Sequence, residues 1–92
     1  MYVLAVNHDV ADYDTWKKSF DSFPPARAGA RFHRINRGLD NANNVTVVSG
    51  FDTAEAALGF RDNPELKQVM GAAGVIGSPR FEIYDEVEAI QY

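Results

Sequence analysis

A chain of 92 residues with 46% apolar and 12% aromatic side chains is long enough for one hydrophobic core and too apolar for a disordered segment. The net charge of −4, with acidic and basic residues interspersed, leaves no basic face for nucleic acid. Cysteine is absent, which excludes disulfides, thiolate chemistry and cysteine-based zinc sites. The N-terminal apolar run is too short for a signal peptide or a membrane span, so we expect one cytoplasmic domain over residues 1–92.

The first predicted elements are a strand and a capped amphipathic helix. Residues 2–6 form a nearly continuous apolar run that becomes polar at Asn7, as expected of a strand buried on both faces. Asp12 is a suitable N-cap for the helix that follows, and Pro24-Pro25 forbids its continuation. The apolar side chains of this helix recur at spacings of three or four and share one face: Tyr13, Trp16, Phe20 and Phe23.

Two strands, a broken helix and a last strand follow. Residues 31–37 and 44–51 have strand character, and the turn-forming residues between them predict a hairpin. Asp52 or Thr53 can cap the next helix. Asn63-Pro64, a cap followed by proline at the first helical position, predicts that the helix breaks and restarts. Gly74 is suited to end it in a left-handed conformation, and the last strand is expected from about residue 80 to about residue 88.

This order predicts the ferredoxin-like βαββαβ plan, an α+β fold with a four-stranded antiparallel sheet and two helices on one face. The strands carry apolar residues of both parities, such as Leu4 and Val6 against Val3 and Ala5. The face opposite the helices therefore also requires cover. Pairing with an identical subunit through this open sheet face is the simplest cover, so we expect a homodimer, with a monomer as the alternative.

The pattern His-x-Val-x-Asp-Tyr-x-x-Trp-Lys, from His8 to Lys17, resembles the beginning of small proteins in the dimeric α+β barrel superfamily. That superfamily includes antibiotic-biosynthesis-type monooxygenases and small cyclases. The run Asn63-Pro64-Glu65-Leu66-Lys67 is similar to the same subgroup, whereas Gly50-Phe51 stands where a bulkier acidic and tryptophan pair is common. The resemblance implies a dimeric α+β barrel and chemistry that often needs no cofactor, and we expect none here. Members run different reactions, so the fold cannot select one.

His8 is the main candidate for catalysis. We expect the first and third strands to be central and parallel, which would gather five polar residues at one end of the sheet: His8, Arg31, His33, Arg80 and Glu82. A histidine titrates near neutral pH and suits general acid-base catalysis, and a nearby arginine could hold an enolate oxygen. The alternative is that His8 bonds a buried backbone carbonyl or caps the following helix.

Four further residues are candidates for binding a small organic ligand: Tyr13, Trp16, His33 and Tyr84. Tyr13 and Trp16 could line an aromatic pocket between helix and sheet, although aromatic residues at helical spacing also suit a plain core. The Tyr84 hydroxyl could orient a ligand carbonyl or pack across the dimer interface. His33 falls on an edge strand and could be solvated. A metal site would need His8 and His33 to be joined by Asp9 or Glu82, but no His-x-x-x-His or comparable short ligand spacing occurs, so we predict none.

Three functions remain open. The first is a cyclase-like or monooxygenase-like, cofactor-independent enzyme that acts on a small aromatic or polyketide-like molecule, with His8 as its acid or base. The second is a non-catalytic small-molecule binding protein, and the third is a structural dimer without pocket chemistry. A pocket of roughly 300 Å³ beside His8 would favour the first two. A filled core with His8 bonded to backbone would favour the third.

Overall fold

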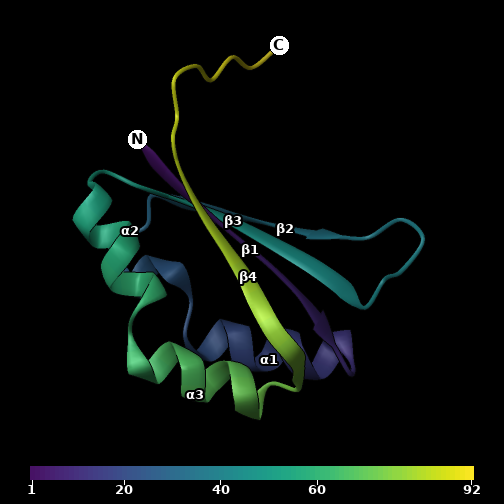
Figure 1. Cartoon of the computed structure of the whole chain (residues 1–92). Helices are drawn as coiled ribbons and strands as arrows, with labels where there is room; N and C mark the ends of the chain where they lie inside the picture. The colour runs from purple at the N-terminus through teal and green to yellow at the C-terminus, as the bar shows by residue number, and fades with distance from the viewer.

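Four strands form one antiparallel sheet in the order β2-β3-β1-β4. The computed structural model describes residues 1–92. Three α-helices and a short 3₁₀ helix, η1, lie on one side of the sheet, as Figure 1 shows. This arrangement confirms the predicted ferredoxin-like fold. The bounds are β1 Tyr2–Val10, α1 Tyr13–Ser22, η1 Pro25–Ala28, β2 Phe32–Arg37, β3 Asn44–Phe51, α2 Ala54–Arg61, α3 Pro64–Ala72 and β4 Val75–Asp85.

The two central strands, β1 and β3, are antiparallel, so the prediction that they are parallel is wrong. The error has a simple cause. The β2-β3 hairpin reverses the chain, and β3 then enters the sheet beside β1 in the opposite direction. The C-terminal end of β1 consequently lies next to the starts of β3 and β4. At the same edge of the sheet, β2 ends rather than starts. In the register of the sheet, His8 stands opposite Val45, and Val45 stands opposite Arg37.

The predicted helix boundaries rest on side-chain caps. The Asp12 carboxylate accepts from the Thr15 backbone N–H at 2.9 Å and thereby starts α1. The Asn63 side chain caps α3, with proline at its first position, and this confirms the predicted break between α2 and α3. For α2 the cap is Thr53, whereas the Asp52 side chain instead binds Arg31 at 2.6 Å.

The last strand begins earlier and ends earlier than predicted. It runs over Val75–Asp85. A bulge near its start interrupts the alternation of inward and outward side chains, so the sequence pattern did not reveal this part of the strand. Asn7 pairs with Arg80 and Asp9 with Ile76, so three residues of β4, 77–79, stand opposite His8 alone. Gly77 has a φ of 71°, a conformation that favours glycine. Strand β1 is also longer than its apolar run and extends to Val10.

The core lies between the helices and the covered face of the sheet. Alternate residues of β1 point into it, among them Leu4, Val6 and His8, all of which are buried. The opposite face carries the other parity and has no layer over it in the single chain (Figure 1). None of the helices is long and apolar enough to cross a membrane.

Candidate functional site

His8 is a buried histidine without a hydrogen-bond partner. Its side chain is 4% exposed, and neither Nδ1 nor Nε2 makes a hydrogen bond to another group of the protein. A neutral imidazole has one donor and one acceptor, and buried groups of this kind are bonded in the great majority of proteins. The bond to a backbone carbonyl, considered from the sequence, is therefore not made in this structure.

Burial lowers the pKa of His8 below its ordinary value of 6.5, because the charged imidazolium loses its hydration. The neighbouring Asp9 carboxylate acts in the opposite direction and opposes part of this effect. At neutral pH the ring is consequently uncharged, with one nitrogen free to accept a proton.

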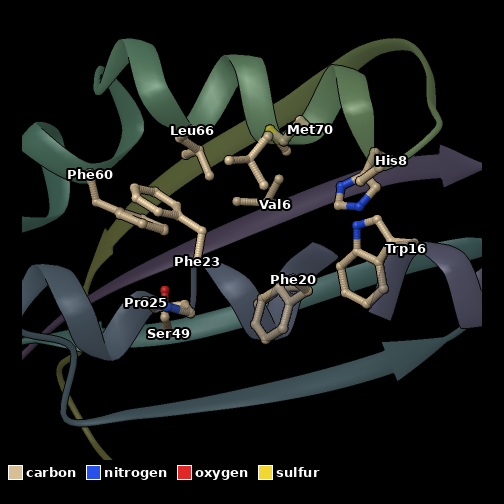
Figure 2. A pocket seen from close by; sticks show the side chains of 13 residues that line it. Val6, His8, Trp16, Phe20, Phe23, Pro25, Ser49, Phe60, Leu66 and Met70 are labelled. Carbon is tan, nitrogen blue, oxygen red and sulfur yellow. The ribbon is translucent and has the colours of Figure 1, made fainter. Parts of the chain in front are cut away.

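A cavity of about 40 Å³ lies beside this ring, between α1, α3 and the sheet (Figure 2). It has room for water but is far smaller than the roughly 300 Å³ of a typical small-molecule pocket. Among the lining side chains only His8 and Ser49 are polar residues. The lining residues are Val6, His8, Trp16, Phe20, Phe23, Pro25, Val47, Ser49, Phe60, Leu66, Val69, Met70 and Ala73.

Aromatic rings extend from His8 along helix α1. The centroids of the His8 and Trp16 rings are 5.5 Å apart, and Trp16 stacks on Phe20 at 5.0 Å. Figure 2 shows the indole nitrogen of Trp16 on the side of its ring that faces His8. The cavity thus combines an imidazole that has no bonding partner in the chain with an aromatic wall.

The other predicted ligand-binding residues lie outside this cavity. Tyr13 contacts Trp16 from the outer side at 5.7 Å between ring centroids, and the Arg37 guanidinium covers its ring at 4.0 Å. His33 is exposed on β2, with its ring edge-on to Phe20 at 5.1 Å. Tyr84 is 53% exposed and pairs with Val3 on the opposite face of the sheet.

The cluster of polar residues expected around His8 does not form. Because β2 runs parallel to β1, its first residues lie at the other end of the sheet, where Arg31 pairs with Asp52. Arg80 and Glu82 bond to each other and align with Asn7 and Ala5, which belong to the open face. No cationic side chain lines the His8 cavity.

Sequence reasoning missed Ser49 and the contribution of α3. The alternation of β3 carried the signal for Ser49, which follows Val45 and Val47 at spacings of two and therefore shares their face. The residues of α3 that line the cavity, Leu66, Val69 and Met70, recur at helical spacing, but which cavity such a stripe covers depends on packing. No group of three histidine, cysteine or acidic side chains is placed to hold a metal ion.

Comparison with known proteins places the fold. No protein-family model and no curated protein matches the sequence. A candidate antibiotic biosynthesis monooxygenase from Deinococcus radiodurans superposes with a TM-score of 0.73 and 13% identity, covering 100% of this chain and 98% of that one. SnoaB from Streptomyces nogalater, a cofactor-independent oxygenase, gives 0.74 and 12% identity over 99% and 97%, as the N63A mutant. A dimeric ferredoxin-like protein from an uncultured marine organism gives 0.69 and 14% over 100% of both chains.

These likenesses confirm the fold expected from the resemblance. The neighbours are antibiotic-biosynthesis-monooxygenase-like and dimeric ferredoxin-like proteins, the group to which the pattern around His8 is similar. At such low identity they establish the architecture, and the function must be argued from the site.

Proposed function

We propose that this chain is an enzyme that acts on a small aromatic or polyketide-like molecule without a cofactor, with His8 as its acid-base group. One observation carries the proposal: neither ring nitrogen of His8, a buried and neutral imidazole that faces a cavity, has a hydrogen-bond partner in the chain. Such a group is costly to the fold, by about 1–3 kcal/mol for each buried unpaired polar atom. Sites that retain a cost of this kind are commonly functional.

Cyclase-like and oxygenase-like reactions can begin with the same step, the transfer of a proton from an acidic carbon or hydroxyl to a base. Here His8 accepts that proton, and the charge left on the substrate spreads into its aromatic system. The walls are largely apolar, and the indole N–H of Trp16 is positioned to stabilise an oxyanion. In an oxygenation the carbanion then reacts with O₂, so that an aryl CH₂ group becomes a carbonyl and the second oxygen atom leaves as water.

Proton transfer can be tested separately from oxygen chemistry. Mono- and bicyclic phenols and aryl ketones are incubated with the protein in D₂O without air, and deuterium incorporation at carbon is followed by NMR. The wild type is expected to exchange at least one ligand class, and His8→Gln to lose exchange while it still binds that ligand. Oxygen uptake in air then separates an oxygenase from a cyclase. Equal exchange rates in both proteins would contradict the assignment of His8.

A non-catalytic binding protein is the second candidate, and the composition of the cavity favours it. Apart from His8, Ser49 and the indole N–H of Trp16, the wall offers no polar side-chain group to direct a reaction. Under this function His8→Gln weakens ligand binding and no exchange occurs with any ligand. A structural dimer, the third possibility, would bind none of the compounds, and His8→Gln would change stability alone.

We also propose that the chain forms a homodimer through the open sheet face. Val3, Ala5 and Val48 lie next to one another on this face, and the Tyr84 side chain stands beside them, 53% exposed. An exposed apolar patch on a sheet is a typical contact between identical subunits. A structural neighbour described as a dimeric ferredoxin-like protein supports this assembly.

A further inference from the structure

A second hollow lies on the other side of helix α3. It is a groove of about 460 Å³ between α3 and β4. Two of its wall residues, Leu66 and Met70, also line the cavity beside His8. Figure 2 shows Met70 on α3 between Leu66 and His8. These two side chains therefore separate the groove from the cavity.

The bulge of β4 ties the groove to His8. Residues 77–79, which stand opposite His8 in the sheet, line the groove as well. A bulge bends its strand away from the regular ladder and is frequent beside functional sites. Here the bulge interrupts the pairing of β4 with β1 at the level of His8, beside the groove.

The separating side chains are suited to movement. Methionine is unbranched and has three rotatable side-chain bonds, and Met70 is only partly buried. With Met70 in this position the cavity beside His8 admits water but no aromatic ring, whereas cavity and groove joined by a movement of Met70 reach the size of small-molecule sites. A ligand that reaches His8 can therefore place the rest of its body in the groove.

The charges of the groove point to one kind of ligand. Arg61 and Lys67 line it, and no acidic side chain does, although the chain as a whole has a net charge of −4. Arg61 already pairs with Asp62 at 2.8 Å, whereas Lys67 takes part in none of the ion pairs. Lys67 is consequently the free cation at this surface.

We propose that the groove between α3 and β4 is the outer chamber of the His8 site, and that its ligand is an elongated, largely apolar molecule ending in a negatively charged group that Lys67 binds. The ring of the ligand enters past Met70 and reaches His8 and Trp16. This inference rests on the proposed role of the His8 cavity as a ligand site, and it adds the route of access and the chemistry of the outer end.

Trp16 allows a direct test, because it is the only tryptophan and it lines the inner cavity. The probes are 6-(4-nitrophenyl)hexanoate, whose ring quenches indole fluorescence, and its neutral primary amide. Both are expected to quench Trp16, with the carboxylate binding up to about fivefold more tightly at low salt. In Lys67→Gln this preference is expected to disappear, whereas the amide binds as in the wild type. Lys18→Gln, an exposed lysine of α1 outside the groove, is the matched control.

The groove itself is tested by filling it. A Cβ on Gly71, which lines the groove, or on Gly59, which lies on α2 outside it, would meet no atom within 4 Å. Gly71→Leu is expected to weaken both probes about tenfold or more, since its side chain takes the space of the ligand, and Gly59→Leu is expected to change neither. Both substitutions favour helix, so the variants keep the fold.

The outcomes separate the two proposals. If the amide quenches Trp16 but Gly71→Leu and Gly59→Leu behave alike, the cavity binds ligands and the groove assignment is wrong. If Lys67→Gln retains the preference for the carboxylate, the negatively charged ligand is wrong. If neither probe quenches Trp16 at any concentration, the inference and the ligand site on which it rests both fail.

Discussion

The imidazole of His8 and the indole of Trp16 lie 5.5 Å apart between ring centroids, with their planes tilted by 50° and no hydrogen bond between them. Local structure brings them together. His8 is near the end of β1, and only two residues separate that strand from α1. Asp12 caps the helix and accepts at its carbonyl oxygen from the Trp16 N–H at 3.0 Å, which orients the first turn over the strand.

His8→Leu is predicted to stabilise the protein and abolish proton exchange. Leucine removes two buried polar atoms without partners, each worth about 1–3 kcal/mol, and it suits the apolar wall. We expect the free energy of unfolding to rise by about 1 kcal/mol or more, measured by urea denaturation at one fixed protein concentration. His33→Leu, at the only other histidine, is the control and should change stability by less than about 0.5 kcal/mol. A less stable His8→Leu variant would mean that His8 has a bonding partner.

The stability of the wild type is predicted to fall as the pH decreases from 7 to 5. The folded protein holds the pKa of His8 below its ordinary value of 6.5, so below that pH the unfolded chain binds a proton that the folded chain does not. The slope from this one group is at most about 1.4 kcal/mol per pH unit and ends once the pH has passed the lower, folded-state pKa.

Urea titrations of the wild type and His8→Leu at pH 7.5, 6 and 5 check this dependence. The stabilisation by leucine should grow toward pH 5, because the variant lacks the titrating ring. Asp12, Asp52 and Asp62 also have pKa values lowered by hydrogen bonds, but their ordinary value is 3.8, so their main effect lies at lower pH. A difference between the two proteins that stays constant over this range would refute the buried, neutral state of His8.

The fold was predictable from local signals, and the site only in part. Caps such as Asp12 and Asn63 act within one turn, so the sequence contains them in full. The parity of β1 likewise puts His8 on the same face as Leu4 and Val6, the face that the helices cover. The direction of β3 relative to β1, by contrast, follows from how the hairpin pairs across the sheet. Because the two strands were predicted to be parallel, Arg31 was placed at the His8 end of the sheet, whereas it lies at the opposite end.

The lack of a hydrogen-bond partner for the two ring nitrogens of His8 could not be predicted from residue types. They depend on how α3 packs over the end of β1 and on the bulge in β4, and both are long-range features. The same holds for the lower pKa of His8, whose main cause is burial in the folded chain. Pattern reasoning can name the face on which a side chain lies but cannot tell what meets it there.

Gly50→Ala is predicted to destabilise the protein and disturb the open face. A Cβ at this position would overlap the ring of Phe32, which lies across Gly50 from the neighbouring strand. The ring has to move, at a cost of about 1–3 kcal/mol typical of overpacking. Gly59→Ala is the matched control, because its Cβ meets no atom within 4 Å and alanine favours helix. Thermal unfolding should therefore shift in opposite directions in the two variants, and a neutral Gly50→Ala would show that Phe32 is free to leave.

Val48→Lys is predicted to convert the proposed dimer into a folded monomer. Val48 lies near the centre of the open face, paired with Ala5 on one side and Arg34 on the other. In a contact between two sheets the new ammonium group would be buried without a partner and close to Arg34, and this cost exceeds what a small interface can offset. In a monomer the same group reaches solvent, so the circular dichroism spectrum should stay unchanged.

Light scattering coupled to size exclusion gives the mass directly and checks this prediction. Leu58→Lys is the matched control, since Leu58 is 39% exposed on α2, an element of the helical layer. The wild type and this control are expected at twice the chain mass of 10.2 kDa, and Val48→Lys at that mass. A wild type that already elutes as a monomer would contradict the dimer, and a Val48→Lys variant that remains dimeric would show that the interface lies away from the sheet face. Because the His8 cavity lies on the opposite side of the sheet, the Val48→Lys monomer should still bind ligand there.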